Sequence, residues 1–147
     1  MILYADTSAL VKAVLQEVGS PDVDRWFAVA DEVAASVITY AEACAALSQS
    51  ARLRHLDDAS LAASLSALEA QWAEVFVVPV PERESGQAAL RHGLRGMDAV
   101  QFATAVELRA LARAGAPAAD VVVASFDRRL LAAAEREGFA TLGGPLG

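Results

Sequence analysis

The chain has 147 residues, of which 55% are hydrophobic, and it carries a formal net charge of −7. This size and composition predict a single domain over residues 1–147 with one continuous core, and they exclude a disordered chain. No apolar run reaches the ~18 residues that span a bilayer, and no basic stretch precedes an apolar segment at the N-terminus. We therefore expect a cytoplasmic protein that does not act at a membrane. The only cysteine, Cys44, cannot form an intramolecular disulfide or a cysteine zinc site by itself.

Short apolar segments alternate with longer helical patterns along the chain. The first segment, MILYA, covers residues 1–5, and three more lie near residues 33–38, 76–80 and 121–125. Alanine and leucine recur at intervals of three and four elsewhere, which predicts helices over 8–18, 21–30, 39–53, 57–74, 82–94, 97–113 and 128–137. Strands separated by helices need crossover connections. The pattern predicts the α/β class: a three-layer α/β/α sandwich with a mainly parallel central sheet.

Four acidic residues occur where predicted strands end or helices begin. Asp6 follows the first strand, and Glu42 lies one turn into the helix after the second. Asp98 is in the first turn of its helix, and Asp127 comes just after the last strand. Ligands of an open parallel sheet bind outside the carboxyl ends of its strands. We therefore expect these four carboxylates to share one edge of the sheet.

Each acid also has a local structural explanation. Asp6 and Asp127 are good helix N-cap residues, and an aspartate such as Asp98 is favoured in a first helical turn. Thr39 and Glu42 match the capping box T-x-x-E. These explanations account for the acids one at a time, but not for four of them at one edge. If the four converge, their mutual repulsion requires a cation.

The types of side chain available favour a hard divalent cation. Mg²⁺ and Mn²⁺ prefer oxygen ligands, keep several waters and accept substrate phosphate oxygens. The two histidines, His55 and His92, are not spaced as a ligand pair, and we expect both on helix surfaces. Arg95, Arg128 and Arg129 adjoin the acids and are candidates for phosphate contacts, with ordinary solvated helix surface as the open alternative.

Four segments in order, ADTSAL, TYAEACAAL, GMDAVQFATAVEL and SFDRRLLAAAEREG, resemble the PIN domain and, within it, the VapC toxins of prokaryotic toxin–antitoxin pairs. The resemblance covers nearly the whole chain and implies the sandwich fold predicted above. It implies an acidic quartet that holds one or two Mg²⁺ or Mn²⁺ ions, formed by Asp6, Glu42, Asp98 and Asp127.

Hydroxyl residues beside the quartet also match the family pattern. Thr7 or Ser8 corresponds to the hydroxyl after the first aspartate, and Ser125 to a small hydroxyl residue two positions before the last acid. The last acid varies among family members, and Asp120 is a competitor for it. Asp120 precedes the fourth strand, however, so it should lie at the opposite edge of the sheet. We therefore prefer Asp127.

The resemblance implies a metal-dependent endoribonuclease, with Asp6 and Asp98 as central ligands and Glu42 or Asp127 orienting the attacking water. It further implies a transfer RNA or ribosomal RNA substrate, a VapB-like antitoxin whose C-terminal segment crosses the active-site groove, and a homodimer. A non-catalytic PIN-fold module that binds RNA or protein remains the alternative. The segment LAASLSALEAQWAEVF serves either core packing or a partner groove between the third and fourth helices.

Related α/β enzymes fit the sequence less well. A receiver domain needs a lysine late in the chain, whereas the only lysine is Lys12. A phosphatase with a D-x-D nucleophile needs an aspartate at the position of Ser8. The phosphate-binding loop G-x-x-x-x-G-K-[ST] is absent.

Overall fold

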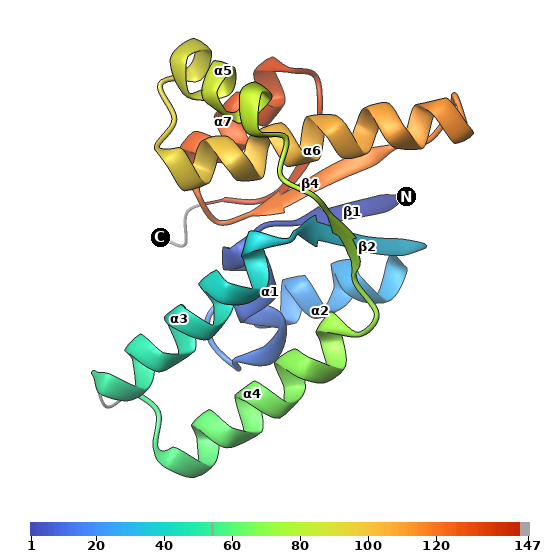
Figure 1. Cartoon of the computed structure of the whole chain (residues 1–147). Helices are drawn as coiled ribbons and strands as arrows, with labels where there is room; N and C mark the ends of the chain where they lie inside the picture. Colours follow the sequence, from blue (N-terminus) through green and yellow to red (C-terminus); the bar gives the residue numbers. More distant parts are fainter. Residues whose placement is uncertain (54, 145–147) are drawn as a thin grey trace.

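The computed structural model describes residues 1–53 and 55–144 and has helices on both faces of a central sheet (Figure 1). The predicted α/β/α sandwich is therefore confirmed. All four strand pairings are parallel, in the order β3-β2-β1-β4-β5. The strands are β1 (Ile2–Ala5), β2 (Glu32–Ser36), β3 (Phe76–Val78), β4 (Val121–Ser125) and β5 (Ala140–Gly143).

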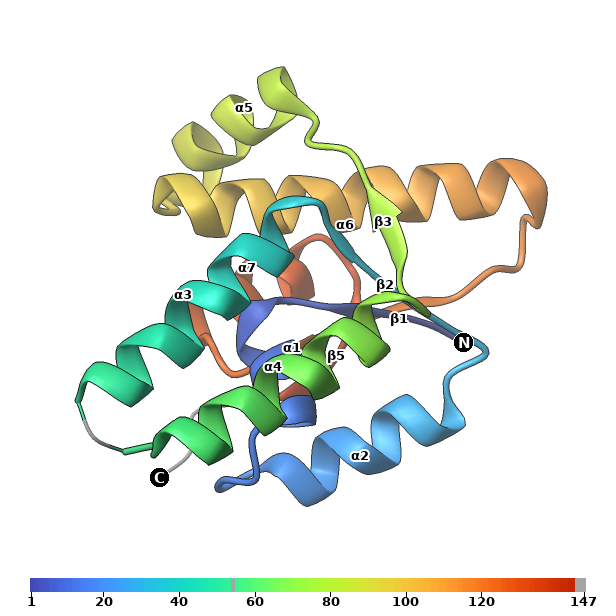
Figure 2. The ribbon, with the colours of Figure 1, turned by 60° about the horizontal axis from the view of Figure 1, so that its bottom comes forward.

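The helices form two groups, one on each face of the sheet. They are α1 (Thr7–Val14), α2 (Ser20–Val29), α3 (Ile38–Arg52), α4 (Asp58–Trp72), α5 (Glu82–His92), α6 (Gly96–Gly115) and α7 (Arg128–Arg136). Helices α1 to α4 lie on one side and α5 to α7 on the other, as Figures 1 and 2 both show. None of the helices within 1–53 and 55–144 is long and apolar enough to cross a bilayer.

The central strands are apolar on both faces because helices cover both. Leu3 and Ala5 of β1 pack in one cluster with Ala9 of α1. Tyr4, between them, points to the other face and packs with Leu108 of α6. Successive side chains of a strand alternate between faces, so a doubly covered strand reads as a continuous apolar run.

The order of the strands reverses at β1, which places the candidate site. The chain runs outward from β1 through β2 to β3, then returns to place β4 on the other side of β1. Ala5 pairs with Ala124, and the Asp6 amide donates to the Ala124 carbonyl at 3.1 Å. Asp6 therefore lies beside the start of the loop that follows β4, at the switch point of the sheet.

Two local predictions were wrong, and one element was missed. The first helix ends at Val14 instead of residue 18, because Ser20 Oγ donates to the Leu15 carbonyl and accepts from the Glu17 amide, which stabilises a turn there. Helix α3 begins at Ile38, so Thr39 lies inside it and is not its cap. Strand β5 was not predicted.

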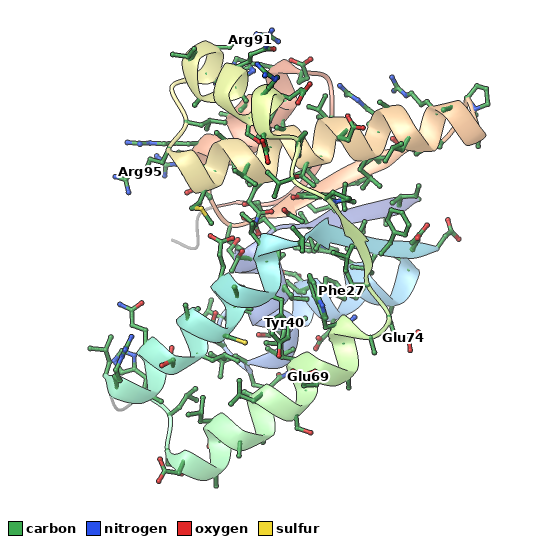
Figure 3. All side chains as sticks on the ribbon, viewed as in Figure 1. Phe27, Tyr40, Glu69, Glu74, Arg91 and Arg95 are labelled. Carbon is green, nitrogen blue, oxygen red and sulfur yellow. The ribbon has the colours of Figure 1, made fainter. Side chains whose placement is uncertain are left out.

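Helices α3 and α4 form a hairpin that extends away from the sheet (Figure 1). Tyr40 of α3 donates to the Glu69 carboxylate of α4 and packs against Trp72, and Figure 3 shows Tyr40 and Glu69 between the two helices. Leu68 is fully buried in this interface, whereas Phe76, just beyond α4, is 47% exposed. The segment thus contributes to the core and also leaves apolar side chains at the surface.

Candidate active site

The four predicted acids line one pocket at the carboxyl ends of the strands. The pocket has a volume of about 630 Å³ and contains Asp6, Glu42, Asp98 and Asp127. Figure 1 shows β1 and β2 ending on the side where α1, α3 and α6 begin. The fold thus brings together carboxylates that are up to 121 positions apart in the sequence.

Asp6 is the most enclosed acid of the pocket, with 5% of its surface exposed. It caps α1, because its Oδ1 accepts from the Ala9 amide at 2.9 Å. The Ser8 hydroxyl donates to the same oxygen at 2.6 Å, and the Ser125 hydroxyl donates to Oδ2 at 2.6 Å. Capping is therefore one of several contacts that fix both oxygens of this carboxylate.

The two serine hydroxyls also fix the loop that carries the last acid. Ser8 Oγ accepts from the Phe126 amide at 2.8 Å, and Ser125 Oγ accepts from the Asp127 amide at 2.9 Å. Each hydroxyl therefore donates to Asp6 and accepts from the chain just after β4. This arrangement sets the spacing between Asp6 and Asp127.

Burial makes ionisation of Asp6 unfavourable. It raises the pKa of Asp6 from its ordinary 3.8 to about 6, against the hydrogen bonds from Ser125, Ser8 and Ala9, which lower it. The negative charge of Asp127 makes a smaller contribution to the same increase. A cation in the pocket would favour the ionised carboxylate.

Glu42 is held by groups from two other elements. Its Oε2 accepts from Thr7 Oγ1 at 2.5 Å and from Gln101 Nε2 at 2.8 Å. The capping box predicted with Thr39 is therefore wrong: the Glu42 side chain reaches across to α1 and α6 instead of back to its own helix. Sequence reasoning missed Gln101. The available signal was a lone amide, three positions after Asp98, in an otherwise apolar stretch of α6.

Asp98 and Asp127 lie at the starts of neighbouring helices. Asp98 is in the first turn of α6. Burial is the main cause that raises its pKa, and the nearby negative charge of Asp127 raises it as well. Arg95 opposes this increase, and Glu42 adds to it. Asp127 caps α7 by accepting from the amides of residues 129 and 130 at 2.8 and 2.9 Å. The negative charges of both Asp127 and Glu42 thus raise the pKa of Asp98.

The predicted arginines lie beside the acids. A second pocket, of about 290 Å³, is lined by Arg95, Asp98, Asp127, Arg128 and Arg129. Its two acids also line the larger pocket, so the two pockets adjoin. The three arginines are exposed, and Figure 3 places Arg95 at the start of α6. Cationic side chains therefore border the acids on one side.

Other charged residues take different positions. Lys12 lines the larger pocket, but its Nζ donates to Glu17 at 2.5 Å and lies 4.9 Å from the centre of the Phe126 ring. Asp120 lies at the opposite edge, where its carbonyl accepts from the Ile2 amide at the start of β1. Among the described residues, no three acidic, histidine or cysteine side chains form a ready metal cage.

Neither histidine lines these pockets. His55 is exposed but lies outside a helix, contrary to the prediction. His92 lies on a helix, as predicted, at the end of α5, but it is half-buried, with its ring 4.7 Å from that of Phe102.

Known proteins match this chain over nearly its whole length. The PIN domain family matches residues 3–136. Ribonuclease VapC45 of Mycobacterium tuberculosis (strain CDC 1551 / Oshkosh) is 34% identical over 140 residues, which are 93% of this chain and 92% of that protein.

Solved structures share the fold. PAE2754 from Pyrobaculum aerophilum has a TM-score of 0.69 at 25% identity, over 96% of this chain and 92% of its own. VapBC2 from Rickettsia felis, bound to a DNA fragment from its promoter, has a TM-score of 0.62 at 12% identity, over 97% and 98%. The predicted resemblance is confirmed: the chain belongs to the PIN domain family and is VapC-like.

Proposed function

We propose that this chain is a metal-dependent endoribonuclease, acting as a single domain over residues 1–147 and as the toxin of a toxin–antitoxin pair. The observation that carries the proposal is the pocket into which separate elements bring Asp6, Glu42, Asp98 and Asp127. The 34% identity to a protein named as a ribonuclease supports the same reaction class.

The donor set of the pocket fits a hard divalent cation. Mg²⁺ is commonly bound through one or two carboxylates and keeps several waters, so it does not need a closed protein cage. The charge of Asp127 raises the pKa of both Asp6 and Asp98, which is the repulsion that a cation would relieve. We propose one or two Mg²⁺ or Mn²⁺ ions, held centrally by Asp6 and Asp98, with Glu42 and Asp127 completing the set.

The residues of the pocket then have distinct roles in phosphodiester hydrolysis. A bound divalent ion supplies Lewis acidity and lowers the pKa of water. Ser8 and Ser125 keep the Asp6 carboxylate oriented, with Thr7 doing the same for Glu42. Glu42 or Asp127 orients the attacking water and accepts its proton.

The arginine side of the site would bind the RNA backbone. The guanidinium groups of Arg95, Arg128 and Arg129 offer planar sets of donors that match phosphate oxygens. Their position beside Asp98 and Asp127 would place a phosphate next to the acids. Water attack in line with the leaving oxygen leaves a 5′-phosphate and a 3′-hydroxyl, and needs no histidine.

Cleavage of a labelled, structured RNA tests the proposal. We expect the wild-type chain to cut it with Mg²⁺ or Mn²⁺, to produce 5′-phosphate ends, and to stop when a chelator removes the metal. Asp98→Asn should abolish cleavage while the protein stays folded, whereas the control Asp120→Asn, at the opposite edge, should cut normally. Metal-independent cleavage, or full activity of Asp98→Asn, would refute the assignment. RNA binding without cleavage would favour the non-catalytic alternative.

The partners we propose follow from the VapC-like character of the chain. They are a transfer RNA or ribosomal RNA substrate, a VapB-like antitoxin and a second copy of the chain in a homodimer. The fold shared with VapBC2 supports the antitoxin. Expression of the chain should arrest growth, and co-expression of a short neighbouring reading frame should relieve the arrest. Sedimentation of the purified chain tests the homodimer.

A further inference from the structure

The amide of Gln101 joins the acid pocket to the core. Gln101 is 4% exposed and lies on α6, one turn after Asp98. Its partners come from three other elements: Tyr4 of β1, Thr7 of α1, and Thr39 and Glu42 of α3. A buried amide without partners is costly, so a network of this extent explains how Gln101 is tolerated.

The two ends of the amide have opposite partners. Oε1 accepts from the buried Tyr4 hydroxyl at 2.6 Å. Nε2 has two hydrogens and lies 2.8 Å from Glu42 Oε2, and 3.1 Å from each of the hydroxyl oxygens of Thr7 and Thr39. The carboxylate is both the nearest and the only charged acceptor, so it receives the strongest of these bonds.

The Tyr4 hydroxyl fixes which way the amide faces. Because Tyr4 donates to Oε1, Nε2 is turned toward Glu42. A flipped amide would place Oε1 against the carboxylate and lose both bonds. Tyr4 is fully buried, so its hydroxyl is held in the core.

These contacts leave one oxygen of Glu42 for the pocket. Oε2 accepts from both Gln101 and Thr7, whereas no described residue donates a hydrogen bond to Oε1. Glu42 lines the acid pocket. The amide is neutral, so it orients the carboxylate and leaves its negative charge intact. An arginine or lysine in its place would cancel that charge.

We propose that Gln101 is a positioning residue that holds Glu42 Oε2 so that Oε1 faces the bound divalent ion. This inference rests on the proposed function, because it assigns Glu42 to the metal. A purely structural Gln101 would contribute to folding only. Partners that orient a metal ligand from behind typically change metal affinity about 10- to 100-fold when removed.

Calorimetric titration of Mn²⁺ into the whole chain tests the proposal without relying on activity. Gln101→Met keeps a side chain of similar length and removes both ends of the amide. We expect its Kd for Mn²⁺ to rise about 10- to 100-fold. The control is Ser85→Ala, because Ser85 is buried on α5 and its hydroxyl donates to the Pro81 carbonyl, away from Glu42 and from the partners of Gln101. We expect this control to keep the wild-type Kd.

A second variant covers the case in which Gln101→Met does not fold. Gln101→Asn keeps a buried amide but withdraws it by one carbon–carbon bond, about 1.5 Å, which is out of reach of Glu42. It should fold and show the same loss of affinity. A wild-type Kd in either folded variant would overturn the inference, as would an equal loss in Ser85→Ala. If the wild-type chain bound no Mn²⁺, the proposed function would fail together with this inference. If wild type bound Mn²⁺ and cleaved RNA, and the Gln101 variants had the same Kd for Mn²⁺, only this inference would fail.

Discussion

Replacing Asp6 by asparagine should stabilise the metal-free protein at neutral pH while destroying its activity. Asp6 is 5% exposed and lies beside the negative charge of Asp127. The native state without metal therefore resists ionisation of this carboxylate. Asparagine keeps the shape of the side chain and removes the charge.

The size of the effect follows from the pKa of Asp6. Its pKa rises from 3.8 in the unfolded chain to about 6 in the native state, a difference of about 2 units, or about 3 kcal/mol at 1.36 kcal/mol per unit. Below pH 3.8 the group is protonated in both states, and its native-state advantage is fully present. Between pH 4 and 6 the unfolded chain loses this proton first, so the free energy of unfolding falls. Above pH 6 the whole advantage of about 3 kcal/mol is lost.

Denaturant unfolding with a chelator present, at pH 4.5 and pH 7.5, measures the effect. The free energy of unfolding of Asp6→Asn minus that of wild type should be larger at pH 7.5 than at pH 4.5 by about 2 kcal/mol, because about 1 kcal/mol of the effect is already present at pH 4.5. Taking this difference cancels the other titrating groups and any constant packing cost of the amide against Ser8 and Ser125. The same difference at both pH values would refute the reasoning that burial disfavours the Asp6 charge.

Three further variants test separate parts of the structure. In thermal unfolding, Gly143→Ala should destabilise the fold by more than the ~1–3 kcal/mol that backbone strain alone costs, because its Cβ would lie 1.9 Å from the Ser125 carbonyl oxygen. The control is Gly144→Ala, which is also at positive φ but whose Cβ would have no atom within 4 Å. Arg95→Ala should weaken RNA binding and reduce its salt dependence, and an unchanged salt slope would contradict a phosphate contact. Asp127→Ala should lose about 1 kcal/mol of cap energy together with activity, whereas Asp127→Ser should keep the cap and still be inactive. Activity in the serine variant would show that Asp127 serves only as a cap.

The strands and helices were predictable where the pattern of apolar residues along the chain identifies a single element. The apolar runs of β1 and β4 are continuous because both their faces are buried, which is the usual sign of a parallel central strand. Strand β5 is different: it lies at the edge of the sheet with two exposed and two half-buried residues, and it begins two positions after Gly138. Its pairing with β4 depends on the close approach of Gly143 to Ser125, which is a tertiary contact with no periodic signature.

The positions of the acids were predictable for a related reason. Asp6 and Asp127 stand at strand-to-helix junctions, and a parallel sheet brings such junctions to one edge. The partners of Glu42 were not predictable, because Gln101 is 59 positions away and belongs to another layer of the fold. Glu42 does not form the local capping box with Thr39, because its carboxylate accepts hydrogen bonds from the distant residues Thr7 and Gln101.

Thermal unfolding with and without Mn²⁺ tests most directly whether the four carboxylates hold a divalent ion. At a hundredfold excess of Mn²⁺ over its Kd, binding to the native state adds about 2.7 kcal/mol, which raises the Tm of a chain of this size by about 5 to 10 °C. We expect this increase in wild type and in Asp120→Asn, and its loss in Asp98→Asn. A wild-type Tm that does not change at Mn²⁺ concentrations supporting RNA cleavage, or an equal increase in Asp98→Asn, would contradict a metal site built from these acids.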